Sequence, residues 1–122
     1  MTEMRLFAAI VVLAVAAGAF AASSLALRAS LHVSPSSVPR GGTLHISGNA
    51  DGCPRGDTVL ILSRAFPGHG FAGLGTVTAR VGRRGRFATT ARIRRYAVRR
   101  VYSVTARCGG GNLGVLARFR VI

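Results

Sequence analysis

The sequence predicts an all-β protein, either a sandwich or a barrel, and two observations carry this prediction. Clusters of Gly, Pro, Ser and Asn recur along the chain from Ser34 onward. The runs between them are short, and most alternate between apolar and polar residues. Evenly spaced short strands separated by such turns are typical of β-sandwiches and barrels. The expected strands lie at 43–47, 58–63, 76–81, 86–93, 102–108 and 113–122.

Each expected strand follows a turn. After the turn at 34–42, Leu44 and Ile46 share one face of a strand and His45 lies on the other. The next run, TVLILS at 58–63, is almost wholly apolar, which suits a central strand. Further turns introduce the later strands and lie at 66–75, 82–85 and 108–112.

The stretch from 86 to 108 threads arginines through an apolar run, and two structures compete for it. As a strand, it places Phe87 and Ile93 on one face and Arg86 and Arg92 on the other. A helix fits only part of the stretch, fails at Arg100 and has no N-cap residue. The strand interpretation is therefore preferred, and most of these arginines face solvent. The same alternation points further side chains inward, namely Tyr102, Val104, Ala106, Cys108, Val115, Ala117, Phe119 and Val121.

The N-terminal segment has the composition of a secretory signal peptide. No residue from Leu6 to Leu27 is charged, and small residues form an A-x-A pattern. The competing interpretation is an uncleaved anchor, because the uncharged run is long enough to cross a bilayer. Only that alternative would place the protein on a membrane. We expect a signal peptide at 1–22, with cleavage as late as Ala26 as a second option, a short linker at 23–30 and one domain at 31–122.

Two cysteines, Cys53 and Cys108, lie in the expected mature domain. An even number of cysteines in an exported chain indicates a disulfide. Closing a loop of this length stabilises the folded state by roughly 4 kcal/mol in the chain-entropy model. The expected location is therefore secreted, either extracellular or associated with the cell envelope.

The charge balance is strongly basic. The 122 residues include 17 Lys and Arg, all of them arginine, against 3 acidic residues, for a formal charge of +14. Such a charge attracts polyanions, and the guanidinium fork binds phosphate and carboxylate in a bidentate manner.

Several stretches of this sequence resemble the secreted bacterial immunoglobulin-like modules. They are LHVSPSSVPRGGTLHISG, GCPRGDTVLILS, the hairpin from Gly82 to Phe87 and VYSVTARCGGGNLGVLARFRV. The opening phrase is also similar to the antibiotic-carrying apoproteins of the neocarzinostatin type, which carry two disulfides where this chain can form one. The resemblance implies a Greek-key sandwich of about seven strands and a Cys53–Cys108 disulfide. It further implies that Tyr102 sits near a strand corner, where its hydroxyl would bond to the backbone.

Basic residues replace the residues usual in two loops of that family, and they form the expected anion-binding sites. One group, at one end of the sandwich, comprises Arg83, Arg84 and Arg86. The other, at the opposite end, comprises Arg94, Arg95, Arg99 and Arg100, joined by Arg40. Either group could clamp an anionic cell-wall polymer or polysaccharide. The alternative is that this charge only keeps a β-protein soluble and monomeric. Sequence-specific nucleic-acid binding is not expected, because aromatics are few and no reading helix is evident.

Two other functions remain open from the sequence. A small-molecule carrier would hold its ligand in a cleft lined by Phe66, Phe71 and Leu74. A purely structural or adhesive accessory module would need no such cleft; the tripeptide from Arg55 to Asp57 spells RGD, but it reads first as a turn. The oligomeric state is left open.

No enzyme, metal or cofactor is expected. The two carboxylates of the expected domain, Asp51 and Asp57, lie in one short loop, and with Asn49 they supply too few oxygens for calcium. A Ser63–His69–Asp57 set can be drawn, but no nucleophile elbow occurs. The histidines do not fall at a metal-ligand spacing; they are His32, His45 and His69.

Overall fold

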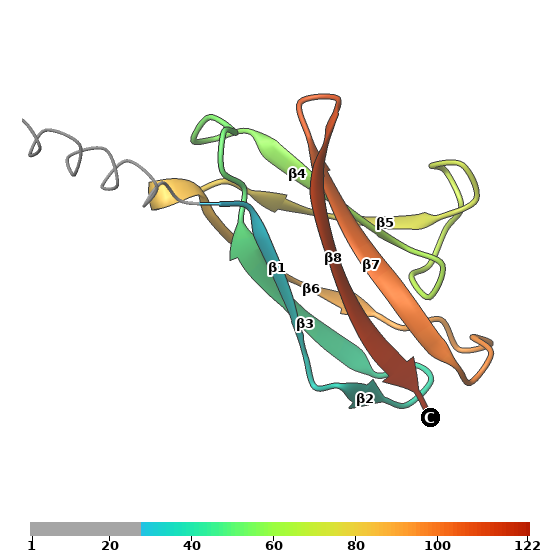
Figure 1. The fold of residues 1–122 in the computed structure, drawn as a ribbon. Coiled ribbons are helices and arrows are strands. Elements are labelled where there is room, and N and C mark those ends of the chain that lie inside the picture. Colours follow the sequence, from blue (N-terminus) through green and yellow to red (C-terminus); the bar gives the residue numbers. More distant parts are fainter. Residues whose placement is uncertain (1–27) are drawn as a thin grey trace, which may run out of the picture.

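Two β-sheets make up the protein in the computed structural model, which describes residues 28–122 (Figure 1). One sheet has three strands in the order β1-β3-β6, and the other has five in the order β2-β8-β7-β4-β5. The expected signal peptide, its cleavage sites and most of the linker lie outside the described residues. Within 28–122, no helix is long and apolar enough to span a membrane. The strands are β1 Ser30–Ser34, β2 Ser37–Val38, β3 Thr43–Asn49, β4 Thr58–Ser63, β5 Gly75–Arg80, β6 Arg86–Arg92, β7 Val101–Cys108 and β8 Gly111–Val121.

The all-β prediction is confirmed. The six expected strands are present as β3 to β8, and the structure adds β1 and the short strand β2, which brings the total to one more than the resemblance implies. Strand β2 pairs parallel with the end of β8, Ser37 opposite Arg120 and Val38 opposite Val121. The chain thus leaves the three-stranded sheet after β1 and joins the five-stranded sheet before returning to β3. Val38 is almost completely buried, which explains why so short a strand holds its place.

The last hairpin is tighter than the sequence predicts. Cys108 pairs directly with Gly111, so β8 begins two residues earlier than expected. Gly109 and Gly110 have φ of 60° and 84°, respectively. Two successive positive φ values are what a two-residue type I′ hairpin turn requires, and glycine adopts them without steric cost.

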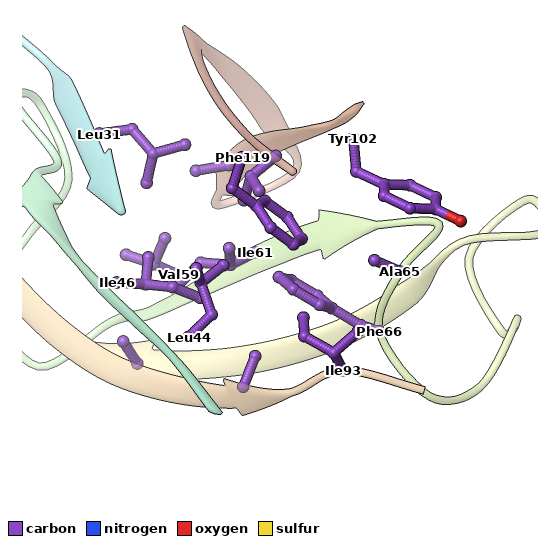
Figure 2. Close-up of a cluster of buried hydrophobic side chains, with 14 of the residues drawn as sticks. Leu31, Leu44, Ile46, Val59, Ile61, Ala65, Phe66, Ile93, Tyr102 and Phe119 are labelled. Atoms are coloured by element: carbon purple, nitrogen blue, oxygen red, sulfur yellow. The ribbon is translucent and has the colours of Figure 1, made fainter. Parts of the chain in front are cut away.

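The predicted alternation of β6 is confirmed. Phe87 and Ala91 are buried between the sheets, whereas Arg86 and Arg92 are exposed. The apolar strand β4 lies between β5 and β7, as its composition predicts. Side chains of both sheets meet in one core, to which each fully buried Leu, Ile or Phe contributes roughly 1.5–3 kcal/mol (Figure 2). The largest fully buried side chains of this core include Phe66, Leu44, Ile46, Ile61 and Ile93.

The disulfide joins Cys53, in the loop before β4, to Cys108 at the end of β7. This confirms the predicted bond. The two cysteines are 55 residues apart in the sequence, and their Cα atoms are 6.4 Å apart. The bond therefore fixes the loop 50–57 to the end of the five-stranded sheet.

Candidate functional site

The two arginine groups lie at opposite ends of β6, an edge strand of the three-stranded sheet in Figure 1. We call Arg83, Arg84 and Arg86 the turn cluster, and Arg94, Arg95, Arg99 and Arg100 the corner cluster. Eight residues of extended chain separate Arg86 from Arg94, a span of about 26 Å at 3.3 Å per residue. Electrostatic interactions in physiological salt are screened over about 8 Å. The two clusters are therefore electrostatically independent patches of the surface.

The corner loop is held by a buried alanine. Ala97 is 2% exposed, and its amide donates to the Arg94 carbonyl at 3.2 Å. Its own carbonyl accepts a 2.7 Å bond from Nε of Arg40. The hydroxyl of Tyr102 donates to the Val98 carbonyl at 2.8 Å, which confirms the predicted backbone partner of this tyrosine. Buried packing and three hydrogen bonds thus fix this backbone.

The inward position of Ala97 turns its two neighbours toward solvent. Tyr96 is 86% exposed and Val98 is 63% exposed. Two arginines of the cluster have structural contacts: Arg94 donates to the Arg64 carbonyl at 3.0 Å, and the Arg100 guanidinium lies 5.5 Å from the centre of the Tyr102 ring. All four arginines of the cluster are nevertheless exposed.

A hollow of about 370 Å³ lies beside Tyr96. One wall is the loop segment 67–69, which brings His69 to the site, and the other is the segment 92–96. The hollow is wide enough for a small organic group. The corner therefore offers guanidinium groups around a recess with one exposed aromatic ring.

The turn cluster is held differently. Arg83–Gly85 form a single 3₁₀ turn in which Arg84 has φ of 56°, in the left-handed region. The side-chain amide of Asn49 donates to the Arg84 carbonyl at 2.8 Å, and the Ala50 amide donates to the Gly85 carbonyl at 2.8 Å. A non-glycine residue in this region costs roughly 1–2 kcal/mol. This backbone is therefore strained as well as bonded.

A larger hollow, of about 550 Å³, lies beside the turn cluster. Arg80 and Arg86 line it together with Asn49, His32 and the small residue Ser47. His32 and His45 both lie on the outer face of the three-stranded sheet, because His32 pairs with Ser47 and His45 pairs with Ser34. Spacing along the sequence gave no reason to group these histidines, although each alternates with apolar residues in its own strand, a pattern that places both on a solvent-facing side.

The three residues expected to line a carrier cleft do not share one environment. Phe66 is fully buried in the core (Figure 2) and offers no surface to a ligand. Phe71 is 38% exposed and lies under the Arg107 guanidinium, 5.5 Å from its ring centre, while Leu74 is half-buried. The amide and carbonyl groups of Phe71 and Leu74 bond to each other across a tight turn.

The loop 50–57 holds the other residues that the sequence singled out. Asp57 lies next to the two cysteine sulfurs, but these form the disulfide and no thiolate is available to a metal. The amide of Asp57 donates to the Pro54 carbonyl, so the RGD tripeptide forms part of a turn, with Arg55 exposed.

Comparison with known proteins provides no identity, since no family model and no curated protein matches this sequence. Function must therefore be inferred from the geometry of the two clusters.

Proposed function

We propose that this chain is an exported, non-enzymatic immunoglobulin-like module of the cell envelope that binds anionic polymers through the corner cluster. Support for an immunoglobulin-like Greek key comes from the strand order, in which β1, β3 and β6 share one sheet and the others share the second. Further support comes from Tyr102, whose hydroxyl bonds to the backbone four residues upstream. Such a tyrosine corner recurs in immunoglobulin-like sandwiches.

Export is supported by two independent features. The Cys53–Cys108 disulfide suits an oxidising compartment. The apolar N-terminal segment preceding this domain has the composition of a signal peptide. Outside the cytoplasm, the polyanions within reach of a secreted basic protein include sugar polymers with carboxylate or phosphate groups.

The observation that carries the polymer-binding proposal is the fixed backbone of the corner loop. Arg40 and Tyr102 hold the carbonyl groups of Ala97 and Val98, so the surrounding guanidinium groups extend from a preorganised loop. Preorganisation reduces the entropy lost when a ligand binds. Arginine also binds phosphate and carboxylate oxygens through paired, charge-assisted hydrogen bonds.

Binding of the mature domain to immobilised polygalacturonate tests the proposal. We expect retention that falls steeply with salt. In the double variant Arg95→Ser/Arg99→Ser, which keeps the contacts of Arg94 and Arg100, we expect roughly tenfold weaker binding, equivalent to about 1.4 kcal/mol.

A matched control removes the same charge elsewhere. Arg55→Ser/Arg118→Ser changes two exposed arginines outside both clusters. We expect this variant to bind within about twofold of the unmodified domain, a difference of less than roughly 0.5 kcal/mol. Equal weakening by both variants would mean that net charge alone, and not the corner loop, attracts the polymer.

A further inference from the structure

Two adjoining hollows lie along the outward face of β6, and a third lies at its far end. The hollow beside the turn cluster is lined by Arg86 and Ala88. A second, of about 380 Å³, shares Ala88 and continues to Thr90. The third, beside Tyr96, begins at Arg92. Successive outward residues of one strand thus connect the two basic clusters.

Small side chains lie along the path between the clusters, and polar side chains flank them. Ser47 and Ala88 are paired across β3 and β6, and both side chains are small. His45 is paired with Thr90 in the same face, and His32 stands beside Ser47 on β1. Hydroxyl and imidazole groups therefore flank a shallow track along this part of the sheet.

We propose that one linear acidic polysaccharide lies along this track, the β6 lane, from the turn cluster to the corner cluster. This inference rests on the proposed function and specifies the class of polymer and its path. Guanidinium groups at Arg86 and Arg92 bind the acidic groups, while Ser47, Thr90 and His45 supply hydrogen bonds to sugar hydroxyls. The lane is about 26 Å long, the length of several sugar units.

A single-stranded nucleic acid fits the lane less well. Binding of single strands depends on aromatic side chains on which successive bases stack. Within residues 28–122 the aromatic rings with more than a third of their surface exposed are Tyr96 and Phe71, and neither lies between Arg86 and Arg92. Short polar side chains occupy that interval instead.

A ligand that reaches both clusters gains avidity. The clusters are too far apart to reinforce each other through their fields in physiological salt, where screening acts over about 8 Å. A chain long enough to occupy both converts the second contact into an intramolecular one, which raises affinity by roughly 10²–10⁴. Binding should therefore depend steeply on chain length.

Calorimetric titration with oligogalacturonates tests the lane. We expect a decamer to bind at least roughly 100-fold more tightly than digalacturonate. Ala88→Glu places a carboxylate in the middle of the lane and should reduce the affinity for the decamer about tenfold, by about 1.4 kcal/mol. The affinity for digalacturonate, which one cluster can hold without the middle of the lane, should fall less than that for the decamer.

Thr78→Glu is the matched control. Thr78 is exposed on β5 in the five-stranded sheet, so this variant has the same net charge as Ala88→Glu. We expect its affinity for the decamer to equal that of the unmodified domain. Ala88→Trp, which blocks the lane by bulk alone, provides a second variant, and circular dichroism should show that each variant retains its β-structure.

The outcomes separate the lane from the proposed function. If the decamer binds no more tightly than the dimer, or if Ala88→Glu and Thr78→Glu weaken it equally, the lane is wrong. The proposed function still stands in that case, provided that Arg95→Ser/Arg99→Ser weakens binding. If the unmodified domain binds neither polygalacturonate nor the decamer, both proposals are wrong.

Discussion

The corner cluster and the turn cluster use the same side chain on two different backbones. At the corner, a buried Ala97 anchors the loop. Arg40 donates to the carbonyl of Ala97, and Tyr102 donates to the carbonyl of Val98. At the turn, Arg84 occupies the left-handed region with φ of 56° and depends on a bond from Asn49. Buried packing fixes the backbone of the corner, whereas a hydrogen bond holds the backbone of the turn in a strained conformation. Charge alone therefore does not define a site, because the conformation of the loop backbone determines where the guanidinium groups are placed.

The two ends also expose different groups to a ligand. The corner adds an aromatic ring, Tyr96, and an aliphatic side chain, Val98, to its arginines. The turn adds an amide, Asn49, and an imidazole, His32, around a hollow of about 550 Å³. Four variants test this difference between the two loops, and they follow in order of decreasing expected effect.

The largest effect is expected from loss of the disulfide. Cys53→Ser/Cys108→Ser should lower the free energy of unfolding by about 4 kcal/mol, because the cross-link closes a long loop. The amide of Ala50 bonds to Gly85, and the Val81 amide bonds to Asp57, so the freed loop adjoins the turn cluster. Amide hydrogen exchange should therefore accelerate most around 50–57 and 81–85.

The corner provides the internal control for that experiment. The amides of Arg94 and Ala97 should keep more of their protection, since they donate to the carbonyls of Ala65 and Arg94 and not to the loop 50–57. Equal acceleration at both ends would show that the two loops unfold together and that the contrast between them is false.

The second effect concerns the anchor of the corner. Ala97→Leu adds volume to a side chain that is 2% exposed, and such overpacking typically costs about 1–3 kcal/mol. The displaced loop should also bind polygalacturonate less tightly. Denaturant unfolding and polymer retention measure the two consequences.

The same substitution at an exposed alanine is the control for the stability measurement alone, because this alanine lies in the β6 lane. Ala88 is exposed on β6, and Ala88→Leu should change the free energy of unfolding by less than about 0.5 kcal/mol. A normal affinity for polygalacturonate in Ala97→Leu, despite the lost stability, would show that binding does not need the fixed corner backbone.

The sequence was sufficient for the alternating strands because burial separates their inward from their outward side chains so clearly. Phe87 and Ala91 alternate with Arg86 and Arg92, and no other periodicity fits them. Strand β2 was missed because two residues are too few for any alternation to be seen. Its position depends on contact with β8, a segment more than eighty residues away in the sequence.

The candidate site was predictable only in part. The basic residues of both clusters are visible in the sequence, and the backbone partner of Tyr102 followed from the family resemblance. Arg40 was expected beside the corner cluster, but its bond to the Ala97 carbonyl could not be anticipated, because it joins loops 57 residues apart. The β6 lane depends on the register of β1, β3 and β6, which alternation alone does not determine.

The third effect tests the hydrogen bond at the corner. Tyr102→Phe removes the hydroxyl that donates to the Val98 carbonyl and should cost about 1 kcal/mol. Tyr96→Phe removes a hydroxyl from a ring that is 86% exposed and should leave stability unchanged. Thermal unfolding of the two variants compares them directly. Equal melting temperatures would show that the Tyr102 hydroxyl does not stabilise the corner.

The smallest effect has the opposite sign and belongs to the turn. Arg84→Asn should raise the free energy of unfolding by about 0.5 kcal/mol, because asparagine tolerates the left-handed region better than arginine does. Arg83→Asn removes the same charge from a residue without positive φ and should give no such gain. If both variants are stabilised equally, relief of charge repulsion and not backbone strain limits the turn, and the two clusters would then differ only in what surrounds them.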